Sequence, residues 1–337
     1  MNETKGLTRR NFLKKGAMFT AIGAACSAGM VEMASAKDGT YATLIDLTKC
    51  DGCKNEPMPK CVEACREENK KKFPEPKEPI KDLWPQKSHD DWSKKRDVTD
   101  QLTPYNWTTV QKIDLEGEEI YIPRRCMHCD NPPCANLCPF GALNKYGDGS
   151  VVINPDLCMG GAKCKVVCPW HIPQRQSGVG FYLKLQPLPA GGGVMYKCDL
   201  CHDRIKKGQI PACVEACEKR LGAKKPLYFG GREAILKMAH KRANEINGFI
   251  YGEEENGGTA TLYVSKIPFE RIDSRLKEAK SNLLMGKVLN PLRQVNAWAK
   301  GFIMGPLIST LGAIGLAIYH RREEKKRRSD AREDHRE

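Results

Sequence analysis

The stretch Cys126-Met-His-Cys129-Asp-Asn-Pro-Pro-Cys134-Ala-Asn-Leu-Cys138-Pro139 places four cysteines within thirteen residues. Three similar runs accompany it, and the four runs together hold fifteen of the sixteen cysteines in the chain. The runs comprise Cys50, Cys53, Cys61 and Cys65; Cys126, Cys129, Cys134 and Cys138; Cys158, Cys164 and Cys168; and Cys198, Cys201, Cys213 and Cys217. Each run ends on a C-x3-C step. The same spacing of cysteines is therefore repeated four times along the chain, as expected for residues that act together as ligands.

This spacing is typical of iron–sulfur cluster binding. In a run of the bacterial ferredoxin type, three cysteines hold one cluster and the fourth, which closes the run, crosses to the other cluster of a pair. Pro139 and Pro169 follow the closing cysteine as in that type, whereas Arg66 and Glu218 follow it in the other two runs. Each run therefore serves two clusters, and the runs must be paired two by two.

Zinc and disulfide bonds are the competing interpretations of clustered cysteines. Tetrahedral zinc is satisfied by two C-x2-C pairs and has no use for a C-x3-C step in every run. A disulfide scaffold predicts an even number of cysteines in a much shorter chain, because 337 residues can bury a core without cross-links. His128 and His202 lie beside the runs, but each run already has its cysteines, so they are interpreted as neighbours of the sites or as surface residues, and not as ligands.

The two ends of the chain carry export and membrane signals. Residues 8–14 read Thr-Arg-Arg-Asn-Phe-Leu-Lys and precede an uncharged stretch and the A-x-A site Ala34-Ser-Ala36, which predicts a twin-arginine signal peptide over residues 1–36. Cys26 is lost with it. Nineteen uncharged residues from Gly301 to Tyr319 predict a transmembrane helix over 297–320, since a helix rises about 1.5 Å per residue and the bilayer core is about 30 Å thick.

The distribution of charged residues predicts how the chain is oriented across the membrane and argues against a nucleic-acid partner. Six of the eight residues 321–328 are basic, which predicts a cytoplasmic tail over 321–337 and places the rest of the chain on the periplasmic face of the bacterial inner membrane. The formal net charge is +14. Basic residues are spread among acidic ones instead of forming one stripe, and export also argues against a nucleic-acid partner.

The remaining pattern predicts an α+β fold with two bacterial-ferredoxin-like dicluster modules. Residues 37–70 and 195–225 form module A, and residues 124–194 form module B. Between the first two runs, residues 71–123 are predicted to be an insertion that begins as a proline-rich loop and ends in a β-hairpin over 107–122. An α/β extension covers 226–290, with strands at 226–229, 249–251 and 261–264 and helices at 232–246 and about 271–284.

Chain order alone allows either nested or sequential pairing of the runs. Only nineteen residues separate the second run from the third, which favours one compact module from those two and a second from the outer runs. That nested pairing is a hypothesis at this point.

The chain resembles, from leader to terminal helix, the four-cluster iron–sulfur (beta) subunits of periplasmic membrane-bound oxidoreductases. The resemblance rests on the cysteine runs, Leu102-Thr-Pro-Tyr105, Cys126-Met-His-Cys129, Gly230-Gly-Arg-Glu233 and Tyr251-Gly-Glu-Glu254 with Asn256-Gly-Gly-Thr259. The likeness is greatest to iron–sulfur subunits of the uptake hydrogenase 2 type, and the beta subunits of formate dehydrogenase and of molybdopterin quinone reductases are similar too.

The resemblance supports nested pairing and implies four ligand sets in a linear chain. These are Cys50, Cys53, Cys61 and Cys217; Cys198, Cys201, Cys213 and Cys65; Cys126, Cys129, Cys134 and Cys168; and Cys158, Cys164 and Cys138. In the third run Gly161 stands where the family has its second ligand. Three thiolates predict a 3Fe-4S cluster beside three 4Fe-4S clusters; the alternative is four 4Fe-4S clusters, with another side chain or hydroxide completing the last.

The sequence contains no dinucleotide loop, nucleophile elbow or obvious metal-hydrolase motif, so we expect no catalysis by the chain itself. The expected role is transfer of electrons between a large periplasmic catalytic subunit, with a nickel–iron hydrogenase favoured, and a polytopic quinone-binding membrane subunit. The same role in a formate dehydrogenase or another molybdopterin complex is one alternative. A membrane anchor or assembly protein with structural clusters, and a free-standing enzyme acting on sulfur compounds, are alternatives of other classes.

Overall fold

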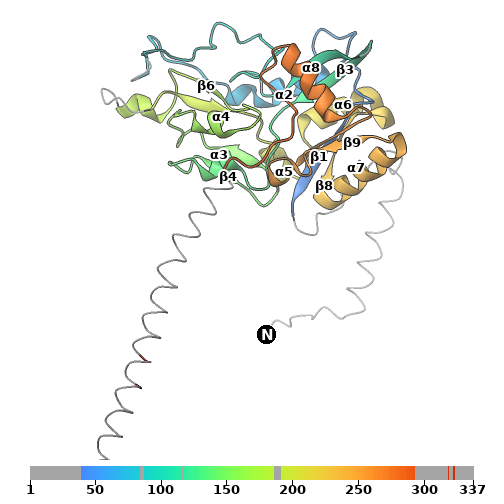
Figure 1. Ribbon diagram of the computed structural model, residues 1–337. Coiled ribbons are helices and arrows are strands. Elements are labelled where there is room, and N and C mark those ends of the chain that lie inside the picture. The colour runs from blue at the N-terminus through green and yellow to red at the C-terminus, as the bar shows by residue number, and fades with distance from the viewer. Residues whose placement is uncertain are drawn as a thin grey trace, which may run out of the picture. The chain divides into compact units, whose positions relative to one another are not determined.

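The computed structural model describes residues 39–83, 87–115, 117–185 and 191–292, together with Ile318 and Arg322 (Figure 1). The predicted signal peptide lies outside this part of the chain, as do nearly all of the predicted transmembrane helix and basic tail. Within the described ranges no helix has both the length and the apolar character needed to cross a membrane. The chain divides into two compact units, Met1–Val288 and Leu289–Glu337, and the first contains every element discussed below.

A four-stranded sheet joins the two ends of the first unit. Its order is β8-β1-β10-β9, formed by Leu227–Gly231, Tyr41–Asp46, Thr261–Ser265 and Phe249–Tyr251 respectively. Strand β1 runs parallel to β10, with Thr43 opposite Thr261, and antiparallel to β8, with Thr43 opposite Phe229. The three strands predicted after the last run are confirmed, whereas β1, which lies between two of them, was not predicted.

Helix α7 (Arg232–Ile246) covers one face of this sheet, as Figure 1 shows. Its residues Ile235, Ala239 and Ala243 are buried against Leu44 and Leu262, and the small alanine side chains let the helix approach the strands closely. Successive residues of a strand point to opposite faces, so Ile45 lies in a different core cluster, together with several cysteines. The helix predicted over 232–246 is confirmed, and it ends at Asn247, which adopts a left-handed conformation with φ +48°.

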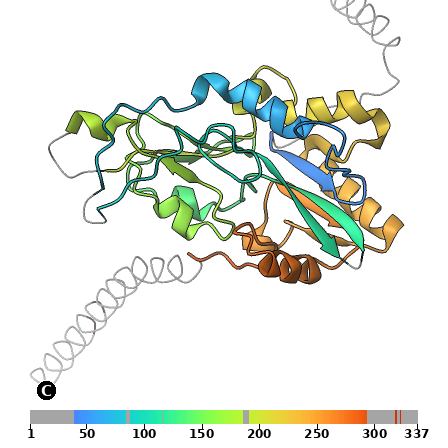
Figure 2. The ribbon, with the colours of Figure 1, turned by 90° about the horizontal axis from the view of Figure 1, so that it is seen from above.

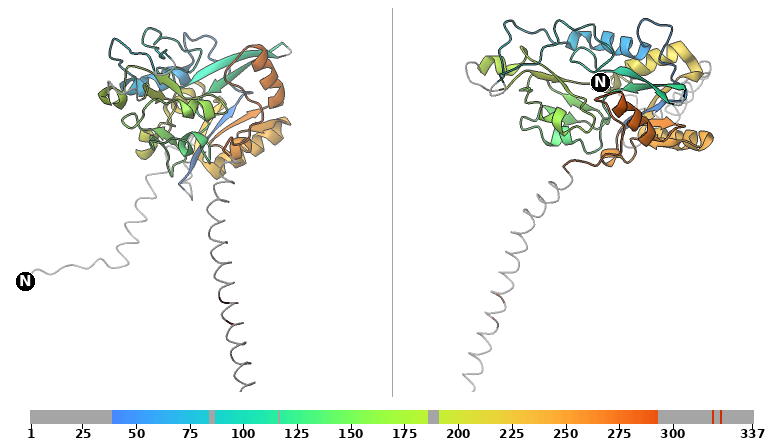
Figure 3. Two further views of the ribbon diagram at one scale, coloured as in Figure 1. Left: turned by 60° about the vertical axis from the view of Figure 1, so that its left-hand side comes forward. Right: turned by 45° about the horizontal axis from the view of Figure 1, so that its top comes forward.

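The β-hairpin predicted before the second run is also confirmed. Strands β2 (Thr109–Leu115) and β3 (Glu118–Arg124) pair antiparallel with Ile113 opposite Ile120, and β3 leads directly into Cys126. Helix α8 (Phe269–Glu278) lies beside the hairpin (Figure 3), where the Arg275 Nε donates to the Asp114 carbonyl oxygen at 2.9 Å.

Helix α8 is shorter than the sequence predicted. The prediction extended it to residue 284, but Lys280 adopts a left-handed conformation with φ +55°. The Ser281 N–H then donates to the Leu276 carbonyl and the Lys280 N–H to the Lys277 carbonyl, both at 2.9 Å. This hydrogen-bond pattern is a Schellman motif, which closes a helix by satisfying its last carbonyl groups.

The remaining elements are short and carry or flank the cysteine runs. The helices are α2 (Lys60–Asn69), α3 (Pro133–Asn136), α4 (Lys163–Val167), α5 (His202–Lys206) and α6 (Ala212–Leu221). Short 3-10 turns lie at Lys70–Lys72, Phe181–Leu185, Gly222–Lys224 and Glu255–Gly257. Two antiparallel ribbons complete the unit, β4–β5 (Leu143–Lys145 and Val151–Ile153) and β6–β7 (Gln174–Gln176 and Val194–Tyr196).

Candidate functional site

Helices α2 and α6 lie side by side and position four of the cysteines (Figure 2). Each carries its pair at positions i and i+4, Cys61 with Cys65 on α2 and Cys213 with Cys217 on α6. Residues at this spacing lie one helical turn apart on the same face. Each helix can therefore contribute one cysteine to each of two neighbouring sites.

The first set of cysteines surrounds a pocket of about 330 Å³ between the loop after β1 and the end of α6. Its lining includes Cys50, Cys53, Cys61 and Cys217. Gly52 between the first two adopts φ +64°, and a Cβ there would lie only 2.0 Å from a ring carbon of Tyr121, so the turn requires glycine. The Asp51 carboxylate accepts from the Cys53 N–H at 3.0 Å.

An ion pair ties the two runs of this first set together. Both guanidinium Nη atoms of Arg220 donate to Asp51, at 2.9 and 2.6 Å. This hydrogen bonding holds the pKa of the Asp51 carboxyl below its usual value. The loop of the first run and the helix of the fourth are thereby held next to the same pocket.

The second set lies beside the first and is deeply buried. Cys65, Cys198, Cys201 and Cys213 are each less than one-tenth exposed, and the charge of the Cys201 thiolate interacts with those of the other three. Several groups donate to its sulfurs: the Arg125 Nη1 lies 2.8 Å from Cys213 Sγ, the Thr108 hydroxyl 3.4 Å from Cys65 Sγ, and the Leu200 N–H 3.4 Å from Cys198 Sγ.

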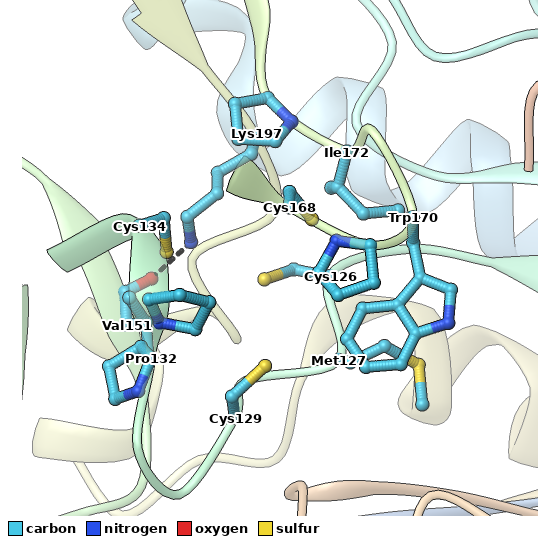
Figure 4. Close-up of a pocket in the computed structure, with 13 residues that line it drawn as sticks. Cys126, Met127, Cys129, Pro132, Cys134, Val151, Cys168, Trp170, Ile172 and Lys197 are labelled. Carbon is cyan, nitrogen blue, oxygen red and sulfur yellow. Dashed lines mark hydrogen bonds between the residues drawn. The ribbon is translucent and has the colours of Figure 1, made fainter. Parts of the chain in front are cut away.

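The third set lines a pocket of about 360 Å³ shown in Figure 4. The sulfur atoms of Cys126, Cys129, Cys134 and Cys168 face a common space. Trp170 and four prolines also line this pocket. Trp170 is 1% exposed and its Nε1 donates to the Tyr251 hydroxyl at 2.8 Å. The Lys197 ammonium enters from one side and donates to the carbonyl oxygens of Val151 and Cys198.

The fourth set contains the three cysteines expected there. Cys164 lies close enough to Cys158 and Cys138 for their charges to interact when the thiols are deprotonated, and the Met195 N–H donates to Cys158 Sγ at 3.4 Å. Gly161 is exposed, does not adopt a positive φ, and has no heavy atom within 4 Å of where its Cβ would lie. The structure therefore leaves open space at the C-x2-C position of the third run.

The four sets follow one another in a series. Cys61 of the first set interacts electrostatically with Cys213 of the second. Cys198 of the second interacts in the same way with Cys126 of the third, and Cys164 of the fourth with Cys134 of the third. The set that lacks a fourth cysteine is thus at one end, and the set lined by Cys50 is at the other.

Burial decides the protonation of these thiols. It raises the pKa of Cys65, Cys164 and Cys168 to about 12 and that of Cys134 to about 11. A thiol must lose its proton before its sulfur can bind a metal as a thiolate. In neutral solution these groups are therefore protonated unless a cation takes the place of the protons, and metal binding releases protons from the protein.

These pockets fit iron–sulfur clusters. All fifteen cysteines described by the structure are free of disulfide bonds, which removes the disulfide interpretation for them. Thiolate sets are the ligands that such clusters require. The buried Arg125 Nε and Nη2 atoms have no hydrogen-bond partner within the described part of the chain, so a donor capable of bonding to cluster sulfur is present beside the second set. Among the described residues, no three His, Cys, Asp or Glu side chains are placed to hold a single metal ion.

Sequence reasoning did not detect the polar groups between the sets. His128 is fully buried, and its Nδ1 accepts from the Val151 N–H at 3.0 Å, so its Nε2 carries the proton and points to Cys198 Sγ at 3.6 Å. His202 is buried as well and bonds to Asp148 at 2.6 Å. Neither histidine lies on the surface, and both adjoin a set of cysteines. The roles of Arg125 and Lys197 had no sequence signal, because a basic residue beside a cysteine is common on exposed loops.

Comparison with known proteins agrees with this geometry. Two family models described as 4Fe-4S dicluster domains match the chain, one over residues 49–142 and the other over residues 118–224. Together they span all fifteen cysteines of the four runs.

Three relatives show how far the similarity extends. A protein of Nitratidesulfovibrio vulgaris is 33% identical over 78% of this chain, which spans 65% of that relative's length. The hydrogenase-2 operon protein HybA of Escherichia coli O157:H7 is 28% identical over 98% of this chain and 99% of its own length. The iron–sulfur subunit of the nitrate-inducible formate dehydrogenase of Escherichia coli K12 is 31% identical over 66% of this chain and 67% of its own length.

The fold and the sites define an iron–sulfur protein of mixed α and β structure with dicluster domains. The chain belongs to the family that includes HybA and the formate dehydrogenase iron–sulfur subunits.

Proposed function

We propose that this chain is the electron-transfer subunit of a membrane-bound oxidoreductase complex and has no catalytic activity of its own. The observation that carries the proposal is that the four cysteine sets form a series. The set that includes Cys50 lies at one end of this series, and the set with three cysteines lies at the other. An iron–sulfur cluster, when bound, accepts and releases one electron at a time. A series of such sites in one chain supports conduction between two partners.

The proximity of the cysteines within each set supports the proposed ligand assignment. Three sets have four thiolates each and would hold 4Fe-4S clusters, whereas Cys138, Cys158 and Cys164 would hold a 3Fe-4S cluster. The open space at Gly161 supports this last assignment, because no side chain of the run stands at the fourth position.

The partners are proposed to be a large catalytic subunit in the periplasm and a quinone-binding subunit in the inner membrane. A nickel–iron hydrogenase is favoured, because the similarity to HybA extends over nearly the whole of both chains. The similarity to a formate dehydrogenase subunit supports that enzyme as the second candidate. We also propose that the chain is exported by the twin-arginine route and is anchored in the membrane by residues 297–320. These two parts of the proposal are supported by the sequence alone.

The decisive experiment combines purification with one substitution. The intact complex is isolated from membranes under anaerobic conditions and analysed for iron, acid-labile sulfide and the metal of the copurifying large subunit. Nickel supports the hydrogenase assignment, and molybdenum or tungsten supports the alternative. Stoichiometric zinc without labile sulfide would overturn the proposal.

Cys53→Ser tests conduction directly. We expect the complex with this substitution to retain partner activity with an artificial dye but to lose reduction of quinone, because one station of the series is damaged. Normal quinone coupling in an assembled Cys53→Ser complex would instead support the anchor hypothesis.

A further inference from the structure

Arg125 is a fully buried positive charge beside the second set of cysteines. Only 2% of the residue is exposed. Its Nη1 donates to Cys213 Sγ at 2.8 Å, whereas Nε and Nη2 have no hydrogen-bond partner in the described part of the chain. A buried guanidinium with two free donors is costly unless an acceptor or a negative charge lies nearby.

The negative charge near Arg125 comes from the second set. Burial lowers the pKa of its guanidinium, but Cys213 and Cys198, when deprotonated, outweigh burial and raise the pKa above its ordinary value. Among the described residues, no carboxylate forms an ion pair with Arg125, and its hydrogen bond goes to Cys213 Sγ. The charge of Arg125 is therefore directed at the group that these cysteines hold.

The second and third sets differ in what the buried basic residue beside each of them donates to. Lys197 is also buried and lies close to Cys126 and Cys134. Its ammonium donates to two backbone carbonyl oxygens, those of Val151 and Cys198, so part of its donor capacity is used by the backbone. Arg125 donates to a sulfur atom directly.

We propose that Arg125 raises the reduction potential of the cluster held by Cys65, Cys198, Cys201 and Cys213, so that this interior station retains electrons. The proposal rests on the function proposed above, because it needs a cluster at this site. A fixed positive charge stabilises the reduced form, which carries one more negative charge than the oxidised form. Charge and hydrogen bonding to sulfur are among the properties that set cluster potentials.

The size of the effect follows from Coulomb's law. With an effective dielectric constant of about 20, a unit charge at about 12 Å changes the ratio of reduced to oxidised cluster roughly tenfold, and one at about 6 Å roughly a hundredfold. For transfer of one electron, each factor of ten corresponds to about 59 mV. Removing the charge should therefore lower the potential by about 60–120 mV.

The test is a redox titration of the anaerobically purified complex, followed by electron paramagnetic resonance. Arg125→Gln removes the charge but keeps an N–H donor, and Arg125→Lys keeps the charge. Arg124→Gln is the matched control. This neighbouring arginine is equally buried and also has two donor atoms without a partner in the described part of the chain, Nε and Nη1. It differs in that it donates to the Leu284 carbonyl at 2.9 Å and not to a cysteine sulfur, and its guanidinium lies 5.9 Å from the centre of the Tyr263 ring. The signal of the second set is identified by its loss in Cys201→Ala.

At the midpoint potential of the wild-type protein, we expect the ratio of reduced to oxidised cluster in the second set to be at least tenfold lower in Arg125→Gln. In Arg125→Lys and Arg124→Gln, we expect the midpoint potential to stay near the wild-type value. An unchanged midpoint in an Arg125→Gln complex with full iron content overturns the inference. Loss of the cluster from both Arg125 variants also overturns it, in favour of a purely structural role. Absence of iron–sulfur signals from the wild-type complex would instead refute the proposed function, so the two failures are distinguishable.

Discussion

Replacing Gly161 with cysteine should convert the 3Fe-4S site into a 4Fe-4S site. Gly161 keeps the C-x2-C offset from Cys158 that the other three runs use for their second ligand. The substitution would restore the missing thiolate without moving the other three. The prediction tests both the ligand set and the reason given for its departure from the family.

The structure indicates that the substitution is tolerated. The Cβ would have no heavy atom within 4 Å, and the backbone is outside the left-handed region, so the free energy of unfolding should change by only about 1 kcal/mol. Gly160→Cys is the matched control. There the Cβ would lie 2.5 Å from the Gly193 backbone, and φ is +66°, so strain and overpacking should cost about 1–3 kcal/mol or more.

The assay is electron paramagnetic resonance of the oxidised protein together with iron analysis. The wild-type protein should show a 3Fe-type signal, and the Gly161→Cys protein should lose that signal and gain one iron per chain. Two results would refute the reasoning: absence of the signal from anaerobically purified wild-type protein, or its persistence in a folded Gly161→Cys protein. The first would favour a cube completed by hydroxide or by another side chain.

Two further predictions concern the first set of cysteines. Asp51→Asn should lower the free energy of unfolding by about 0.2–1 kcal/mol near neutral pH, the range for a partly exposed ion pair, because the Arg220 interaction is lost. Since the folded-state pKa of Asp51 is lowered, this stabilisation is lost as the pH falls through that pKa, and urea unfolding in acid should show no difference between the two proteins. Gly52→Ala should reduce the iron content, because its Cβ would overlap the Tyr121 ring; full iron content would show that the loop can rearrange.

Local patterns in the sequence were sufficient for much of the fold. The alternation over residues 107–122 identified the hairpin, which the structure has at 109–124, and helical spacing identified α7 with the bounds that the structure shows. The predicted end of α8 was wrong for a local reason that is harder to detect in the sequence. Lys280 is not a residue expected in a left-handed conformation, so the Schellman motif gave no signal.

Long-range features could not be predicted in the same way. Strand β1 has six residues and no partner near it in the chain, since its parallel neighbour β10 lies more than two hundred residues away. The spacing of the cysteines predicted the sites, but nothing in the sequence predicted that the charge of Arg125 lies beside one of them. Only the three-dimensional structure reveals that Arg125, directly after β3, points to Cys213 on α6 and not to solvent.

The sheet explains how the first set can form from residues so far apart. Strand β1 ends at Asp46, four residues before Cys50, and β8 begins at Leu227, ten residues after Cys217. These strands are antiparallel neighbours with Ile45 opposite Leu227, and the Asp46 N–H donates to the Pro226 carbonyl at 2.8 Å. The pairing holds both ends of the first set together, so this set depends on contacts of long sequence separation, which form slowly. The third and fourth sets need only residues 126–168 and can assemble from local contacts, whereas the first and second sets require the chain to be complete through Cys217.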